Sequence, residues 1–411
     1  MKILWIKANK LLPVHSGGDI RSYHIVRELG RNNAVTFFSY YDGKPDSNYE
    51  RALSEELPGS VSVCTGKGEG TAARALDYVT RVGSGSPYAV SRFECRKVQE
   101  KLKEWFANKS FDVAVCDFLD AAINLPHQLT IPTVLFQHNV ESEIWRRHAE
   151  TESNAWKRWL YSMEFRKMQQ YEKETVAKFN HVVAVSEHDR QLMAAWIARD
   201  KITVVPTGVA GGVYKPDPAV NEEDSLVAFT GAMDWAPNID AVEYFCREIW
   251  PAVLGVVPSA RFRIVGRNPD RRVEKLASAA IEVTGRVPSV VDHLRKAAVV
   301  VVPLRIGGGT RLKIYEAMAT GKAVVSTSVG AEGLDVHDGR DILLANDASA
   351  FAQAVANLLL NRQVRQAYGR AALELASKFD WRTVGQKFGG VLSAVLGSAT
   401  SKKDYAYSGE V

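Results

Sequence analysis

The sequence has 411 residues, of which 46% are apolar and 24% charged, and its 52 basic and 47 acidic side chains give a net charge of +5. This composition excludes a disordered or collagen-like chain, and the length predicts two or three domains. Basic residues are spread along the chain rather than gathered in a tail, so we expect no nucleic-acid partner.

Membrane-spanning and disulfide-rich classes are also disfavoured. The apolar run Ala297–Pro303 is far shorter than the roughly 20 residues that span a bilayer. The first residues lack the apolar core and cleavage site of a signal peptide. The cysteines show neither CxxC nor regular spacing: Cys64, Cys95, Cys116 and Cys246. We therefore expect a cytoplasmic protein without a disulfide framework or a zinc site.

In the first half of the chain, short apolar segments alternate with helical patterns. Apolar strands separated by helices are typical of a parallel sheet covered on both faces. The expected strands are 3–6, 35–38, 61–63, 113–115, 133–136 and 182–185, and the expected helices include 19–29, 92–108 and 142–178.

The same alternation begins again after a loop at residues 206–212. The expected strands are 226–229, 261–265, 281–283, 298–302, 323–326 and 342–344, and the helices are 239–254, 290–297, 312–320, 349–360 and 381–396. The pattern predicts an α/β protein of two Rossmann-like, doubly wound parallel-sheet domains. Ligand is expected in a cleft where the carboxyl ends of the two sheets face each other.

A glycine-rich loop between a buried strand and a helix has the chemistry of a phosphate site. Gly307, Gly308 and Gly309 let backbone approach an anion, and the helix that starts near Thr310 offers free N–H groups. The nearby cations are Arg305, Arg311 and Lys313. The alternative is a flexible turn beside a solvated basic face.

Glu316 lies further along the same helix. A carboxylate can accept two hydrogen bonds from neighbouring hydroxyls, such as those of a ribose. The alternative is an exposed helix glutamate, which the apolar neighbours Tyr315, Ala317 and Met318 disfavour.

These residues resemble family 4 of the retaining, nucleotide-sugar-dependent glycosyltransferases, which have the two-Rossmann-domain GT-B fold. Residues 316–321 match the second half of the family's Glu-x7-Glu motif, and 205–216 resemble its interdomain segment. Gly17–Gly18 match its N-terminal glycine loop. Phe229–Gly231 match the strand end of its donor domain, and Phe379–Trp381 match the start of its crossover helix. The variant pattern resembles a branch found among bacterial surface-polysaccharide transferases.

Three features depart from the family pattern. Gly308 stands where the first glutamate of the motif is expected, and Ala210 replaces a frequent aspartate. The arginine and lysine that neutralise the diphosphate after the first donor-domain strand are missing from 231–238. We expect the cations near the glycine loop to replace them, with Asn238 as a polar contact.

The resemblance implies further site residues. His138, which follows an apolar strand, is expected beside the donor sugar, although a histidine there is also typical of capping or packing. Gly17 and Gly18 are expected to contact the diphosphate at a helix start. Arg286 and Val287 fall where the family holds the base, or in a structural turn.

The expected domains are an acceptor-side domain of 1–205 with the crossover helix 380–397, a donor domain of 206–379, and a flexible tail at 398–411. The resemblance implies retaining transfer from a UDP- or GDP-linked sugar to a glycan or lipid-linked acceptor. His138, Arg311 and Lys313 would act in catalysis, with no metal. The alternatives are an inactive sugar-nucleotide-binding subunit and a sugar-nucleotide 2-epimerase of the same fold. The sequence does not determine the oligomeric state.

Aromatic and basic residues alternate along the expected helix 142–178. The aromatic members are Trp145, Trp156, Trp159, Tyr161 and Phe165. This mixture suits peripheral contact with an anionic membrane, at the inner face for a cytoplasmic protein. A packed helix that covers the domain is an equal alternative, and several glutamates disfavour the membrane.

Overall fold

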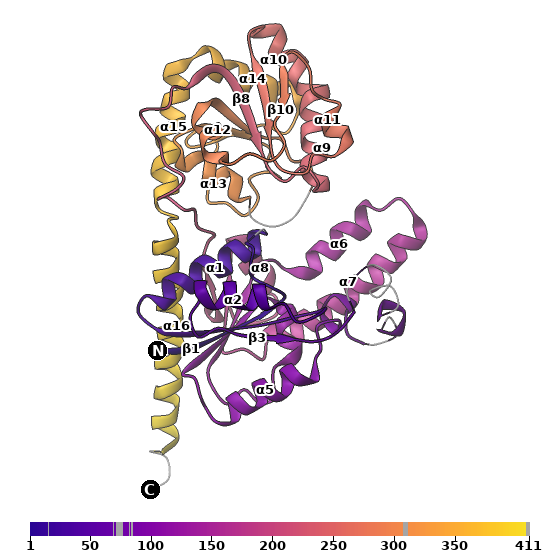
Figure 1. The fold of residues 1–411 in the computed structure, drawn as a ribbon, viewed down its shortest axis with the longest axis vertical. Coiled ribbons are helices and arrows are strands. Elements are labelled where there is room, and N and C mark those ends of the chain that lie inside the picture. Colours follow the sequence, from indigo (N-terminus) through magenta and orange to yellow (C-terminus); the bar gives the residue numbers. More distant parts are fainter. Residues whose placement is uncertain are drawn as a thin grey trace. The chain divides into compact units, whose positions relative to one another are not determined.

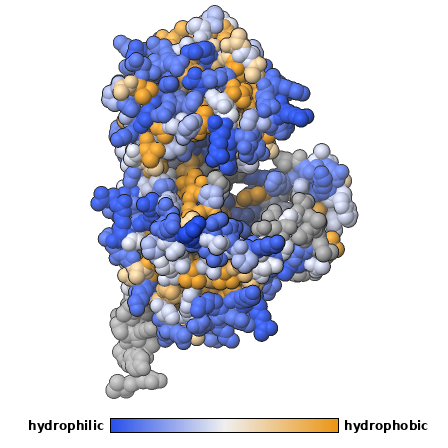
Figure 2. Space-filling model, in the orientation of Figure 1, coloured by the Kyte–Doolittle hydropathy of each residue, from blue (hydrophilic) through white to orange (hydrophobic). Residues whose placement is uncertain are grey.

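The computed structural model describes residues 1–14, 16–68, 70, 77–81, 83, 85–306 and 311–407. It divides into two units (Figure 1). Unit 1 contains Met1–Pro206 and the chain from Val384 onward, and unit 2 contains Thr207–Thr383. Residues 380–383, which were expected with the crossover helix, therefore belong to unit 2. On the face drawn in Figure 2, hydrophilic residues predominate and apolar areas are interspersed.

Unit 1 is built on a seven-stranded parallel sheet with the order β3-β2-β1-β4-β5-β6-β7. Its strands are β1 (Lys2–Ala8), β2 (Ala34–Tyr41), β3 (Val61–Cys64), β4 (Val113–Asp117), β5 (Thr133–Gln137), β6 (His181–Ala184) and β7 (Ile202–Val204). The order reverses between β1 and β4, which makes this the switch point where such sheets bind ligands. The first six strands were predicted, whereas the short β7 was not.

The helices of unit 1 correct one prediction. They are α1 (Gly17–Gly30), α2 (Ser47–Glu56), α4 (Tyr88–Ser91), α5 (Arg96–Ala107), α6 (Glu141–Thr151), α7 (Ala155–Val176) and α8 (Glu187–Met193), with 3-10 turns η1 (Leu119–Asn124) and η2 (Arg199–Lys201). The expected helix 142–178 is wrong, because it is broken at Asn154. The side chain of Asn154 caps α7 by accepting hydrogen bonds from the backbone of Trp156 and Lys157.

The last helix, α16 (Trp381–Tyr407), covers the sheet of unit 1. The Phe388 ring lies 5.4 Å from the ring of Trp5 and 5.1 Å from that of Phe136. The helix continues to Tyr407, beyond the predicted end of the crossover helix at residue 397.

Unit 2 contains a six-stranded sheet with the order β10-β9-β8-β11-β12-β13. Its strands are β8 (Glu223–Thr230), β9 (Arg261–Val265), β10 (Ile281–Val283), β11 (Ala297–Val302), β12 (Ala323–Ser326) and β13 (Leu343–Leu344). The registered strand pairs are parallel, and every residue of β11 is buried, as expected for a central strand covered on both faces. Here the switch point lies between β8 and β11.

The helices of unit 2 flank this sheet. They are α9 (Ala236–Tyr244), α10 (Trp250–Val256), α11 (Arg271–Glu274), α12 (Val290–Lys296), α13 (Leu312–Ala319), α14 (Ala348–Leu360) and α15 (Arg362–Ser377). A π turn, η3 (Phe245–Ile249), separates α9 from α10 within the expected helix 239–254. The sequence did not predict α15.

The first and last segments of unit 2 are joined to each other. The backbone N–H of Val209 donates to the carbonyl of Phe379 at 2.8 Å, and that of Trp381 donates to the carbonyl of Val209 at 3.3 Å. A Cβ on Gly208 would lie 2.6 Å from the Trp381 ring, so only glycine fits there. Across the part of the chain that the structure describes, no helix is long and apolar enough to cross a membrane.

Candidate functional site

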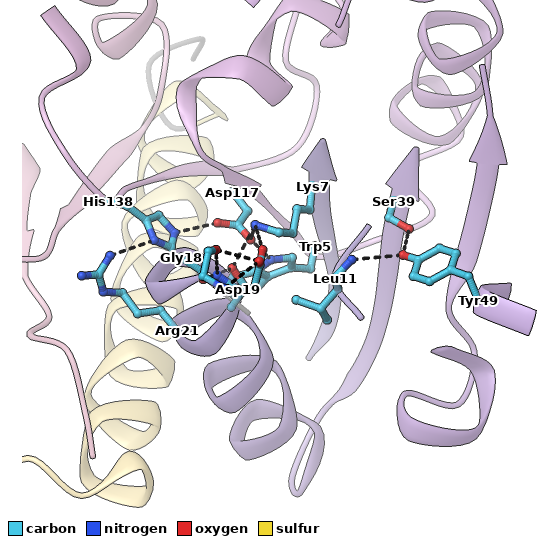
Figure 3. A network of polar contacts seen from close by, with 12 residues as sticks. Trp5, Lys7, Leu11, Gly18, Asp19, Arg21, Ser39, Tyr49, Asp117 and His138 are labelled. Atoms are coloured by element: carbon cyan, nitrogen blue, oxygen red, sulfur yellow. Dashed lines mark hydrogen bonds and ion pairs between the residues drawn. The ribbon is translucent and has the colours of Figure 1, made fainter. Parts of the chain in front are cut away.

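At the switch point of unit 1, polar side chains gather behind the carboxyl ends of β1, β4 and β5 (Figure 3). Asp117 ends β4, and His138 directly follows the end of β5. Lys7 lies near the end of β1, and Arg21 lies on α1. Parallel strands place their carboxyl ends at one edge, which brings these residues together from distant parts of the sequence.

Both ring nitrogens of His138 are engaged, and its side chain is fully buried. Nε2 lies 2.7 Å from Oδ1 of Asp117, and Nδ1 lies 3.3 Å from a guanidinium nitrogen of Arg21. Because arginine can only donate, Nδ1 accepts, and Nε2 must carry the proton that it donates to Asp117. Burial lowers the pKa of His138 to about 4, against the opposing effect of Asp117, so the ring is neutral at pH 7.

Asp117 is the centre of this cluster. Its Oδ2 accepts a hydrogen bond from Nε1 of Trp5 at 2.9 Å and lies 3.4 Å from Nζ of Lys7. Lys7 also lies 3.5 Å from a carboxylate oxygen of Asp19. Burial alone would raise the pKa of Asp117, but Lys7 and His138 hold it below its usual value. The carboxylate is therefore ionised and compensated.

The glycine loop predicted to contact the diphosphate lies beside this cluster. A Cβ on Gly18 would lie 2.8 Å from the Phe118 ring and 3.7 Å from Nδ1 of His138. The Phe118 ring stacks on the imidazole, with centroids 3.9 Å apart and planes 10° apart. Gly17 begins α1, two residues before the expected start, and Ser16 caps this helix. The structure thus brings Gly18 and His138 together.

In unit 2, Lys313 reaches the carboxyl end of β8. Its Nζ donates to Oδ1 of Asn238 at 2.7 Å and lies 4.2 Å from the centre of the Phe229 ring. The amide nitrogen of Asn238 donates to the carbonyl of Ala232 at 2.8 Å. A Cβ on Gly231 would lie 2.8 Å from that Nζ, so this glycine makes room for the lysine. Lys313 therefore places a cation at the end of β8, where residues 231–238 lack the arginine and lysine of the family pattern.

The surroundings of Lys313 leave its charge poorly compensated. Burial, reinforced by the charge of Arg311, lowers the pKa of Lys313 to about 7, whereas Glu316 acts in the opposite direction. Arg311 is buried, with its guanidinium 5.8 Å from the centre of the Trp235 ring.

Glu316 is not a solvated helix residue. Burial raises its pKa, while a hydrogen bond from Tyr214 and the charge of Lys313 oppose that rise. The sequence did not single out Tyr214.

The remaining predicted residues either have other surroundings than expected or lie outside the described residues. Arg305 forms a two-pronged ion pair with Asp240, at 2.5 and 3.1 Å, and covers the Tyr244 ring. Its charge is therefore committed to Asp240, which differs from the expected role. Arg286 is exposed and Val287 half-buried after the edge strand β10. Gly307, Gly308, Gly309 and Thr310 lie outside the described residues.

Sequence comparison decides the family. Residues 20–210 match the family described as Glycosyltransferase Family 4, and residues 224–361 match Glycosyl transferases group 1. Together the two matches cover most of both units. The chain belongs to the family 4, group 1 glycosyltransferases.

Relatives of this glycosyltransferase come from several bacteria. It is 23% identical to an uncharacterized 44.6 kDa protein in the cps region of Klebsiella pneumoniae, over 64% of this chain and 70% of that protein. It is also 23% identical to the phosphatidyl-myo-inositol mannosyltransferase of Mycolicibacterium smegmatis, over 78% of this chain and 82% of the relative.

A solved structure has the same fold. Anabaena Alr3699/HepE, in complex with UDP and glucose, matches with a TM-score of 0.65 and 14% identity, over 96% of this chain and all of that one. The predicted GT-B fold is thereby confirmed.

The glycosyltransferase also contains site residues that sequence reasoning missed. Arg21 and Asp117 hold His138, and Lys7 pairs with Asp117. A charged residue that ends an apolar parallel strand, as Asp117 does, is the signal that could have identified the cluster. In the described ranges, no group of three or more histidine, cysteine or acidic side chains is placed to hold a metal ion.

Proposed function

We propose that this glycosyltransferase transfers a sugar, with retention of anomeric configuration, from a UDP- or GDP-linked donor to a glycan or lipid-linked acceptor in bacterial surface-polysaccharide synthesis. The observation that carries the proposal is the half-buried Lys313, whose Nζ donates to the side-chain amide oxygen of Asn238 near the end of β8. A desolvated cation held by a neutral partner suits a developing phosphate charge.

Each residue has a role in this proposal. Lys313, Arg311 and the start of α13 neutralise the leaving diphosphate, so the reaction needs no metal ion. Glu316 accepts hydrogen bonds from the ribose. His138, neutral and fixed as one tautomer by Asp117 and Arg21, shapes the sugar pocket. The leaving phosphate oxygen takes the proton of the acceptor hydroxyl, while the glycosidic bond to the acceptor forms on the same face.

The comparisons support the donor class and the biological setting. The structural neighbour from Anabaena was solved with UDP and glucose, and one relative is named for the cps region of its bacterium. A mannosyltransferase acting on a phosphoinositide is named among the relatives, which supports a lipid-linked acceptor.

The test is a panel of UDP- and GDP-linked hexoses, with and without crude bacterial glycolipid, read by release of nucleoside diphosphate. We expect one donor to turn over and the product to keep the donor's anomeric configuration by NMR. Nucleotide binding without turnover of any donor would instead identify an inactive sugar-nucleotide-binding subunit. Conversion of the donor sugar without an acceptor would identify an epimerase.

A further inference from the structure

The turn between α6 and α7 forms the tip of a helical hairpin. The two helices lie side by side in unit 1 (Figure 1), and residues 152–154 connect them. Oδ1 of Asn154 accepts from the backbone N–H groups of Trp156 and Lys157, both at 3.1 Å. Because this cap fixes the start of α7 directly after the turn, the backbone of the first helical turn is ordered and its side chains point in fixed directions.

Two tryptophans on that first turn are exposed to water. Trp156 is 70% exposed and Trp159 is 54% exposed. Their ring centroids lie 5.0 Å apart and their planes differ by 21°, so they form one stacked block on one helix face. Tryptophan is a large apolar side chain that proteins usually cover, and a solvent-facing pair therefore indicates an interaction surface.

The charge around this block is positive. Between Glu152 and Trp159 the charged residues are Glu152, whose carboxylate accepts from the backbone N–H of Asn154 at 2.9 Å, and the exposed cations Lys157 and Arg158. Within the described part of the chain, neither cation forms an ion pair. The nearby carboxylate of Glu150 is paired with Arg146 at 2.5 Å, and that of Glu164 is buried and accepts from the backbone of Tyr88.

We propose that this tip, defined by Trp156, Lys157, Arg158 and Trp159, docks the enzyme onto an anionic lipid bilayer. The indole rings enter the headgroup boundary, where their apolar body and polar N–H are both accommodated. The two cations contact lipid phosphates. The proposal goes beyond sugar transfer and does not depend on which donor is used.

Exposed tryptophans can also bind a carbohydrate, but the groups at the tip that would bind sugar hydroxyls already accept backbone hydrogen bonds. Sugar hydroxyls are bound by amide and carboxylate groups beside the ring. The amide oxygen of Asn154 is already engaged by two backbone donors, and the carboxylate of Glu152 accepts from the backbone N–H of Asn154. Lys157 and Arg158 outnumber the single carboxylate of Glu152, and two cations match phosphate rather than neutral hydroxyls.

The test is sedimentation of the full chain with vesicles of phosphatidylcholine alone, or of equal parts phosphatidylcholine and phosphatidylglycerol. We expect binding to the anionic vesicles and weaker binding at high salt. Replacing Lys157 and Arg158 by glutamine should lower the partition coefficient roughly thirtyfold. The Trp156→Ala, Trp159→Ala double variant should lower it at least about tenfold.

The matched control is the double variant Lys97→Gln, Lys103→Gln, which removes two exposed cations from α5. It should retain vesicle binding, and all variants should keep the wild-type thermal transition and affinity for UDP. The proposal is overturned if the wild-type chain does not bind anionic vesicles, or if the control weakens binding as much as the tip variants. It is also overturned if the tryptophan variant loses affinity for a soluble polysaccharide and not for vesicles.

Discussion

Each unit places a lysine at the switch point of its sheet, and the two lysines have opposite surroundings. Lys7 lies within 3.5 Å of the carboxylates of Asp117 and Asp19. Although burial opposes it, their charges raise the pKa of Lys7. Lys313 is held by a neutral amide and, over the described ranges, no carboxylate lies within ion-pair distance of it. The pKa of Lys313 is lowered to about 7.

Under the proposed function, the charge of Lys7 stabilises the fold, whereas the charge of Lys313 serves to bind an anionic ligand. A buried ion that is already compensated contributes to the fold and fixes its neighbours, as Lys7 does for Asp117 and His138. A desolvated cation without an anionic partner is destabilised until an anion arrives. We therefore propose that the two switch points differ in function despite similar topology.

The largest effect is expected at Asp117, whose charge is compensated by Lys7. Asp117→Ala would leave Lys7 without its central partner, and we expect a loss of about 3–5 kcal/mol in the free energy of unfolding, measured by urea denaturation. Glu100→Ala, which removes an exposed ion pair with Arg96, is the control and should change stability by less than about 1 kcal/mol. Equal losses of unfolding free energy in the two variants would contradict a structural role for the Asp117–Lys7 pair.

The second largest effect is expected at Lys313. Lys313→Ala should lower kcat by about 10²–10³-fold with little loss of stability, because it removes charge stabilisation of the leaving group. The control is Arg305→Gln, whose guanidinium is already paired with Asp240 and should matter by only a few-fold. Steady-state kinetics with the donor found in the panel would measure both variants. The reverse ranking would show that Arg305 neutralises the diphosphate.

A smaller effect is expected at the helix start beside His138. Gly18→Ala would push a Cβ against the Phe118 ring, at a cost of about 1–3 kcal/mol in unfolding free energy. Gly30→Ala, at the other end of α1, meets no atom within 4 Å and should stabilise by about 0.5–1 kcal/mol. Thermal or urea denaturation of the Gly18→Ala and Gly30→Ala variants would measure both changes in stability. A loss confined to Gly18→Ala would show that the close contact with Phe118, rather than glycine replacement in general, causes it.

The smallest effect is a pH dependence of nucleotide binding. Because burial lowers the pKa of Lys313 to about 7, raising the pH above 7 deprotonates it and weakens UDP binding, by at most about tenfold per pH unit. Lys313→Arg should abolish this dependence, since a guanidinium stays charged. Isothermal titration between neutral and mildly alkaline pH tests it, and an unchanged slope in the arginine variant would refute the assignment.

The sheets were predictable, because their central strands are continuous apolar runs such as Val113–Val115 and Ala298–Val302, and a buried parallel strand requires that pattern. The break at Asn154 was not, since helical periodicity continues through it and only the local cap reveals the turn. Helix α15 was not predicted from the sequence because its inner face contains an arginine, Arg365. This side chain is buried because it pairs with Glu222 and donates to backbone carbonyls of α14. A charged residue at an inward position hides an amphipathic pattern.

The candidate site was predictable only in part. Lys313, Asn238 and Gly231 were all noted in the sequence, but their direct contact joins segments far apart in the chain. The partners of His138 were invisible for the same reason, because Asp117, Lys7 and Arg21 reach it through tertiary folding. Sequence motifs mark ligand-binding loops well, whereas the side chains that hold a site residue in place carry no local signature.

The isolated β-bridge between Val209 and Asp380 means that the chain enters and leaves unit 2 at neighbouring points. Unit 2 is thus a continuous segment inserted between Pro206 and Val384 of unit 1. Segments whose ends meet can be exchanged without reconnecting the rest of the chain. Replacing residues 207–383 with the corresponding segment from another family member should therefore change the donor sugar while the acceptor domain stays intact.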